Sequence, residues 1–166
     1  MKDKGTRYDP VFFGMFFLGM FSVIAQVTFA REMLVVFSGN ELVIGTILAG
    51  WLLGISVGAV ASNAVSKIPF KRVLLVGLAV IIAVLFPLQV YFVRIARALF
   101  EVPVGEYAPF SVIMTVSIFF FMPTCIGIGL LFPLACAVAE GKETVSTAYT
   151  FEAFGSMLGG VILSFV

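Results

Sequence analysis

The residues of this chain that could do chemistry are a few charged and amide side chains inside long apolar segments. Arg31 and Glu32 stand side by side in the run from Gln26 to Glu41. Charged groups at membrane depth are costly and are usually paired or functional. Neighbouring side chains point about 100° apart on a helix, so we expect each charge to have a partner elsewhere. Two interpretations stay open, an ion-pair ring that fixes helix register and a polar gate or substrate vestibule.

Other polar side chains extend this set of candidates. The candidate polar positions, with a gating or a structural role, are Gln26, Arg31, Glu32, Asn40, Glu41, Gln89, Tyr149 and Glu152. Asn40 is suited to cap the helix that Glu41 opens, where a carboxylate favours the positive end of the helix dipole. Gln26 and Gln89 fall at similar depths and could bond to each other or line a cavity.

Glu152 lies about one and a half turns inside the last apolar segment, three residues after Tyr149. Residues three apart share a helix face, so both side chains could serve one cavity. An ionisable group in such a segment is a site candidate by default. The alternative is a structural carboxylate bonded to a neighbouring helix or to the loop near Ser62 and Asn63. We expect Glu152 to face the interior and to have a polar partner there.

The composition is that of a membrane protein. Of 166 residues, 61% are hydrophobic and 11% charged, and the mean hydropathy is +1.18. A bilayer core about 30 Å thick needs about 20 apolar residues per helix. We therefore expect an all-α polytopic integral membrane helix bundle, a single transmembrane domain over residues 1–166. Its five transmembrane helices are predicted at about 11–37, 41–61, 73–95, 110–139 and 147–166.

The residue types that are missing exclude several kinds of site. The chain has no histidine, which excludes His-ligated haem and His-bearing metal sites. On one helix, Cys125 and Cys136 would lie about 16 Å apart, too far for a disulfide. No phosphate-binding glycine loop follows a strand pattern, and the net charge of +1 gives no nucleic-acid signal. We therefore expect no catalytic residue, metal, cofactor or nucleic-acid partner.

The distribution of Lys and Arg predicts a cytoplasmic N-terminus. In that orientation three basic residues lie outside, Arg31, Arg94 and Arg97. The seven inside are Lys2, Lys4, Arg7, Lys67, Lys71, Arg72 and Lys142. This bias follows the positive-inside rule. The expected location is a bacterial inner (cytoplasmic) membrane. The last helix has no polar terminator, so we expect the chain to be a fragment of a longer protein.

Glycines four residues apart predict close helix packing. The predicted packing positions are Gly50, Gly54, Gly58, Gly155 and Gly159. Such stripes are flat surfaces on which another backbone can approach closely. They fit static packing, and they equally fit a sliding contact between the rocking helices of a transporter.

Two stretches resemble the membrane domain of multi-pass spermidine-synthase-like proteins. Residues 24–59 carry a Gln, then Arg-Glu, Gly-Asn-Glu-Leu and Trp-Leu-Leu before a stripe of small residues. Residues 127–166 carry Phe-Pro-Leu, then Tyr-x-x-Glu-x-x-Gly-Ser-x-x-Gly-Gly. That membrane domain is itself similar to half of a major-facilitator transporter. Residues 58–75 echo the basic loop of that superfamily but lack its Asp and its Gly-Arg-Arg run.

The resemblance implies a setting more than a reaction. In that family a cytoplasmic aminopropyltransferase-like domain is commonly fused to the membrane domain, and it would lie outside these residues. The expected function is a non-catalytic membrane domain that anchors or assembles a larger enzyme or complex and could handle a polyamine-like small molecule. The expected partners are the lipid bilayer and other membrane subunits or a fused cytoplasmic domain. The alternatives are a lipid- or quinone-contacting subunit of a respiratory or photosynthetic complex and a half-transporter acting as a dimer.

Overall fold

The fold is built from helices, as the composition predicts. The computed structural model describes residues 10–39, 41–65, 68–103, 105–139 and 144–165, and every regular element in these ranges is helical. The elements are α1 (Pro10–Val36), α2 (Glu41–Val65), α3 (Lys71–Leu99), α4 (Phe110–Val116), the π-helical turn η1 (Ser117–Phe121), α5 (Met122–Ala139) and α6 (Thr144–Ser164). The expectation of an all-α fold is confirmed.

Four helical stretches of the described chain are long and apolar enough to cross a membrane. They are α1, α2, α3 and the continuous stretch Phe110–Ala139 that comprises α4, η1 and α5. These stretches indicate an integral membrane protein in contact with lipid. The sequence predicts a fifth span at 147–166, but α6 is not among the stretches that qualify. Glu152 and several hydroxyl residues lower the mean hydropathy of α6, so the fifth span stays a prediction. The cytoplasmic location of the N-terminus also stays a prediction.

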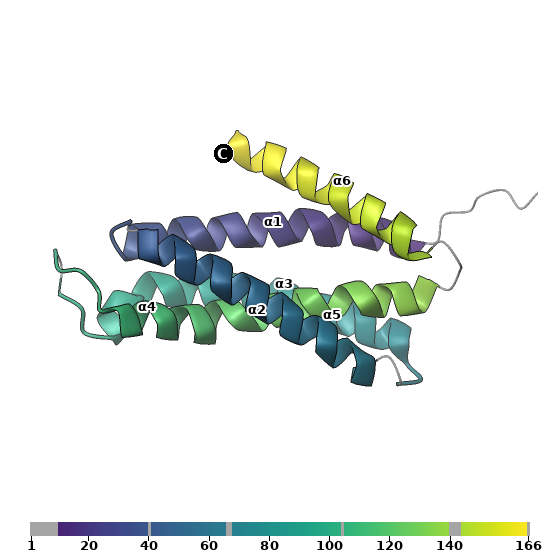
Figure 1. The fold of residues 1–166 in the computed structure, drawn as a ribbon, viewed down its shortest axis with the longest axis horizontal. Helices are drawn as coiled ribbons and strands as arrows, with labels where there is room; N and C mark the ends of the chain where they lie inside the picture. The colour runs from purple at the N-terminus through teal and green to yellow at the C-terminus, as the bar shows by residue number, and fades with distance from the viewer. Residues whose placement is uncertain (1–9, 40, 66–67, 104, 140–143, 166) are drawn as a thin grey trace, which may run out of the picture.

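The helices form two intimate pairs. Helices α1, α3 and α6 run in one direction, and α2 and α4–α5 run in the other (Figure 1). The most extensive contacts join α1 to α6 and α2 to α5. Helix α3 packs on α5 and α1, whereas α6 touches α5 only slightly. Figure 1 shows α6, in yellow, lying on the outer side of α1 and diverging from the other helices toward its C-terminal end.

Stacked aromatic rings hold α1, α2 and η1 together in the core. The rings of Phe29 and Phe121 stack with centroids 4.1 Å apart and an interplanar angle of 12°. Trp51 of α2 also stacks with Phe121, with ring centroids 5.9 Å apart and an interplanar angle of 27°. Phe29 and Phe121 are fully buried. Such pairs stabilise by about 0.5–1.5 kcal/mol beyond the area they bury, so this stack fixes the central register of the three elements.

The π-helical turn has a local cause in Pro123. Proline has no N–H, and its ring clashes with the carbonyl four residues earlier, which here belongs to Phe119. The backbone widens instead of breaking, and the Met122 N–H donates to the carbonyl of Ser117, five residues earlier. Helix α5 then continues through Pro133, as α3 continues through Pro87.

Two helices extend beyond the ranges that the apolar pattern predicts. Helix α2 continues to Val65, and α3 begins at Lys71 and ends at Leu99. The added residues include Arg97 and other polar side chains, which a helix tolerates where it reaches the membrane interface. The turn after α1 contains Ser38 and Gly39, both with positive φ (62° and 60°). The Gly39 N–H donates to the Leu34 carbonyl at 2.8 Å, which closes the end of α1.

Candidate functional site

The C-terminal ends of α1 and α3 meet in an ion pair. Arg94 donates from Nε to Glu32 Oε2 at 2.8 Å, and its Nη2 bonds the other carboxylate oxygen. Two nitrogens of the guanidinium therefore bond the two carboxylate oxygens, which is the two-pronged arrangement that arginine favours with carboxylates. The Glu32 side chain is 18% exposed and that of Arg94 is 63% exposed. The pair therefore lies at the edge of the bundle, where it holds α1 against α3.

Arg97 donates hydrogen bonds to three backbone carbonyls at the same end of the bundle. Its Nη1 donates to the Val36 carbonyl at 3.1 Å, at the last turn of α1. Its Nη2 donates to the carbonyls of Glu106, at 3.0 Å, and of Pro103. A helix end leaves carbonyls without partners inside the helix, and a cation there also favours the negative end of the dipole. Arg97 thus positions the connection between α3 and α4, which is a structural role.

The remaining residues of this polar end are placed as follows. Arg31 is exposed on α1, beside Glu32. Glu41 is the acidic residue in the first turn of α2. Asn40, the predicted cap of that helix, lies outside the described residues. The structure brings Glu32, Arg94 and Arg97 together at one end of α1 and α3, and this favours the interpretation of a cluster that fixes register.

A buried polar bond joins α3 to α5. The Thr124 hydroxyl donates to Gln89 Oε1, and both side chains are buried. Thr124 directly follows Pro123 in the first turn of α5, three residues after the π-helical turn ends at Phe121. Gln26 lies half-buried on α1. Of the two glutamines that fall at similar depth, Gln89 therefore bonds to a threonine of α5 and not to Gln26.

Two of the three glycines of the α2 stripe lie against α5. A Cβ built on Gly54 would lie 2.5 Å from the Cβ of Cys125, and one on Gly58 would lie 2.9 Å from the Ile126 carbonyl carbon. From the other side, a Cβ on Gly129 of α5 would overlap the backbone of Ile55. Gly50 differs, because a Cβ there would have nothing within 4 Å. The close contact therefore covers only the second half of the predicted stripe.

The second close contact joins α1 to α6. A Cβ on Gly159 would lie 2.8 Å from the carbonyl oxygen of Met20, and one on Gly155 would overlap the backbone of Phe16. Gly19 supplies the matching surface on α1, because a Cβ there would overlap the Glu152 carbonyl. Both predicted glycines of α6 thus face α1, and this contact attaches α6 to the bundle.

Glu152 and Tyr149 do not share a cavity. Glu152 is half-buried on α6. Tyr149 is 65% exposed and meets the ring of Phe132 edge-on, with centroids 6.2 Å apart. No side chain of the described residues donates a hydrogen bond to the Glu152 carboxylate. The expected partner on the first two helices or the following loop is therefore absent from this part of the chain.

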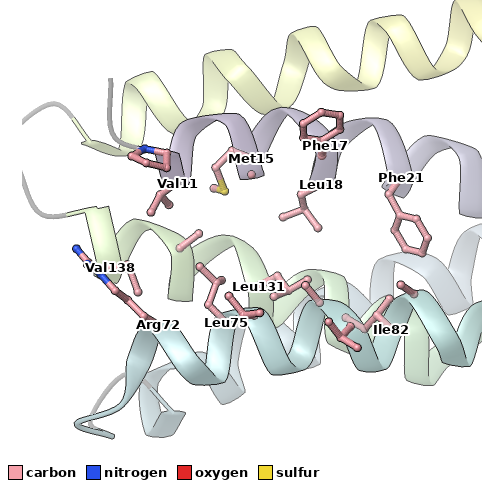
Figure 2. A pocket seen from close by; sticks show the side chains of 17 residues that line it. Val11, Met15, Phe17, Leu18, Phe21, Arg72, Leu75, Ile82, Leu131 and Val138 are labelled. Atoms are coloured by element: carbon pink, nitrogen blue, oxygen red, sulfur yellow. The ribbon is translucent and has the colours of Figure 1, made fainter. Parts of the chain in front are cut away.

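A large cavity lies elsewhere, in a groove between α1, α3 and α5. Its volume is about 870 Å³, and its walls are almost entirely apolar. Figure 2 shows Arg72 at one end, near Val11 and Val138, and Phe21 and Ile82 toward the other. Small side chains open the space, including Gly14 on α1 and two alanines on α3. We call this space the α1–α3 groove.

Several of these features are missing from the sequence predictions. They are the α1–α3 groove, Thr124, and the partner glycines Gly19 and Gly129. Lys71 and Arg72, next to an apolar helix start, were the available signal for the groove. A groove also needs small residues on two helices that face each other, and no pattern within one helix reveals that.

The described residues bring together no group of three metal-ligating side chains. Cys125 is buried, and Cys136 is half-buried without a disulfide partner. The arrangement can therefore hold helices together, pair a carboxylate with an arginine at the edge of the bundle and accommodate an apolar chain. No family model, curated protein or solved structure matches the chain.

Proposed function

We propose that this chain is a non-catalytic integral membrane domain of a spermidine-synthase-like protein. Its role is to anchor a larger enzyme or complex in the membrane or to assemble it. The observation that carries the proposal is the Glu152 carboxylate, half-buried on α6 and without a side-chain hydrogen-bond donor among the described residues. A carboxylate costs several kcal/mol in an apolar setting when it has no partner. The partner is therefore a cation or donor that another segment, another subunit or a bound amine supplies.

The position of α6 supports this role. It is attached to the bundle mainly through α1, and its outer face is apolar and exposed at Phe154, Met157 and Val161. Transmembrane helices associate through packing and hydrogen bonds. A helix with an exposed apolar face, and with a carboxylate that accepts no side-chain hydrogen bond within the described ranges, is therefore suited to receive a partner helix. The resemblance at Tyr149, Glu152 and Gly155 falls on this same helix.

Site-specific cross-linking tests the assembly role. A photoreactive residue at Met157, on the exposed apolar face of α6, is compared in native membranes with one at Val60, exposed on α2. We expect Met157 to yield a discrete protein adduct. Glu152→Gln should retain the adduct, because the amide still accepts a hydrogen bond, and Glu152→Leu should lose it. Lipid adducts alone at both positions would contradict the proposal.

A polyamine-like cation at Glu152 is the small-molecule form of the same proposal. Spermidine binding to the protein in nanodiscs should be lost in Glu152→Gln, whereas the adduct at Met157 is kept. The removal of the charge takes away the ion pair and leaves the hydrogen-bond acceptor in place. Equal spermidine binding by both proteins would exclude the amine and leave assembly as the role. Flux of spermidine by the isolated chain in liposomes would instead identify a half-transporter.

A further inference from the structure

The α1–α3 groove is about as deep as one leaflet of a bilayer. Along α1 it extends from Pro10 to Phe21, about 16 Å at about 1.5 Å per residue. Along α3 it extends from Arg72 to Ala83, about 16 Å. Half of a hydrocarbon core about 30 Å thick is about 15 Å. The groove therefore begins where α1 and α3 begin and ends near the middle of the membrane.

Aromatic rings close the inner end of the groove. Phe21 of α1 meets Phe86 of α3 edge-on, with centroids 5.7 Å apart. Between this contact and the starts of α1 and α3, the walls are open toward the membrane, because Phe17, Val76 and Val80 are more than half exposed. A chain that lies in the groove is thus bounded at its methyl end and is accessible from the side, as an acyl chain of the surrounding lipid requires.

The end of the groove at the membrane surface, near the starts of α1 and α3, is cationic. Arg72 lines the groove and also a neighbouring pocket of about 590 Å³, which Lys71 lines as well. Residues 69–73 and 137–139 form that pocket, at the start of α3 and the end of α5. Within the described ranges no carboxylate pairs with Lys71 or Arg72. An apolar channel with an adjoining basic pocket at its interfacial end has the two-part chemistry of an anionic amphiphile.

We propose that the α1–α3 groove binds one anionic phospholipid of the leaflet that surrounds the N-terminal ends of α1 and α3. One acyl chain lies between α1 and α3 and ends at Phe21 and Phe86. The phosphate lies in the neighbouring pocket, where Lys71 and Arg72 neutralise it. This site is independent of Glu152, which lines neither pocket.

The observations favour this occupant over two others. A free phosphate or a small soluble anion would use the basic pocket and leave about 870 Å³ of apolar groove unexplained. A quinone would fill the apolar channel but offers no negative charge to Lys71 and Arg72. A phospholipid with a net negative charge uses both parts, and its chain length matches one leaflet.

Native mass spectrometry of the purified full chain tests the site with defined probes. The protein is titrated with phosphatidylglycerol and with phosphatidylcholine of the same acyl chains. We expect one phosphatidylglycerol to bind at least about fivefold more tightly than phosphatidylcholine, since one basic residue near a headgroup contributes about that factor. The double variant Lys71→Gln/Arg72→Gln should remove this preference. Arg31→Gln, which removes a charge exposed on α1 outside the groove, should keep it.

A second pair of variants tests the apolar part. Gly14 lines the groove and has nothing within 4 Å of a built Cβ, so Gly14→Phe adds a ring at the groove wall from a position where the Cβ itself meets no neighbour. Gly45 on α2 has the same open surroundings outside the groove, so Gly45→Phe is the matched control. Gly14→Phe should weaken the binding of both lipids, and Gly45→Phe should weaken neither.

Four outcomes would overturn the proposal. They are equal affinity for the two lipids in the unaltered chain, equal effects of Gly14→Phe and Gly45→Phe, full competition by glycerol 3-phosphate alone, and displacement of phosphatidylglycerol by ubiquinone. The third would identify a free-phosphate site, and the fourth a quinone site. A fifth contradicting outcome is a dimer that Gly14→Phe dissociates, which would show that the groove is an interface between two copies of the chain.

Discussion

A Cβ built on Gly155 of α6 would overlap the carbonyl oxygen of Phe16 on α1. The two backbones are therefore in direct contact at this point, and no side chain lies between them. Transmembrane helices that approach so closely gain packing and weak Cα–H···O contacts that larger residues prevent. This contact attaches α6, and with it Glu152, to the rest of the chain.

We expect Gly155→Ala to loosen α6 from α1. The added methyl group forces one backbone to move, and overpacking of this kind costs about 1–3 kcal/mol. Gly160, five residues later on the same helix, has nothing within 4 Å of a built Cβ. Gly160→Ala should therefore leave stability unchanged or raise it slightly, because alanine favours the helix. Thermal unfolding in detergent measures both, and equal behaviour of the two variants would contradict the contact.

The stripe on α2 gives a second matched pair. Gly58→Ala should destabilise the protein, because the methyl group would overlap the Ile126 backbone of α5. Gly50→Ala should be tolerated, since its Cβ would meet nothing within 4 Å. Chemical unfolding of the reconstituted protein, followed by the fluorescence of Trp51, measures the difference. A larger loss in Gly50→Ala would show that α2 packs with its first half and not its second.

The glycine spacing predicts which helix faces are flat, but it does not predict where the contact ends. Gly50, Gly54 and Gly58 are equivalent in the sequence, yet only the last two meet α5. Two helices that cross at an angle stay in backbone contact over a limited length, and the crossing angle depends on both partners. For the same reason Gly19 and Gly129 attract no notice until their partner helices are known.

The polar residues show the same limit. Apolar surroundings mark Glu32, Gln89 and Glu152 as costly in the sequence alone, and this much is predictable. Their partners are not, because Arg94 is 62 residues from Glu32 and Thr124 is 35 residues from Gln89. The local sequence pattern predicts the helices, whereas the bonds between helices depend on which residues distant in the sequence the fold brings together.

We expect Arg97→Gln to be more damaging than Arg94→Gln. Arg97 donates to three backbone carbonyls, and loss of such charge-assisted bonds costs about 1.5–3 kcal/mol. Arg94 is largely exposed, so its bond to Glu32 is screened and Arg94→Gln should have a small effect that salt reduces. Hydrogen exchange of residues 100–109 should rise in Arg97→Gln only. Equal exchange in both variants would mean that Arg97 does not hold this connection.

The Lys and Arg distribution predicts that the connection between α3 and α4 lies on the side of the membrane opposite the cytoplasm. Tyr107 and Phe70 are strongly exposed beyond opposite ends of α3, so single cysteines there report the two sides. In a chain that lacks Cys125 and Cys136, an impermeant maleimide added to whole cells should label Tyr107→Cys. Phe70→Cys should need opened membranes. The reverse pattern would place the N-terminal end of α1 outside.

The last prediction concerns the bond between Gln89 and Thr124. Thr124→Val keeps the shape of the side chain but removes the hydroxyl, which leaves the buried Gln89 amide unsatisfied. Such a group costs about 1–3 kcal/mol. Thr115→Val is the control, because the Thr115 hydroxyl donates to the Ser111 carbonyl one turn earlier in its own helix. It should cost much less.

The double variant Gln89→Leu/Thr124→Val separates a bond from two independent polar groups. If the two side chains satisfy each other, removing both should recover much of the stability that Thr124→Val loses, because no unpaired polar group stays buried. Thermal unfolding of the four proteins in the same detergent gives the coupling free energy between the two positions. Additive losses would mean that Gln89 has another partner, and that α3 and α5 are held together by packing alone.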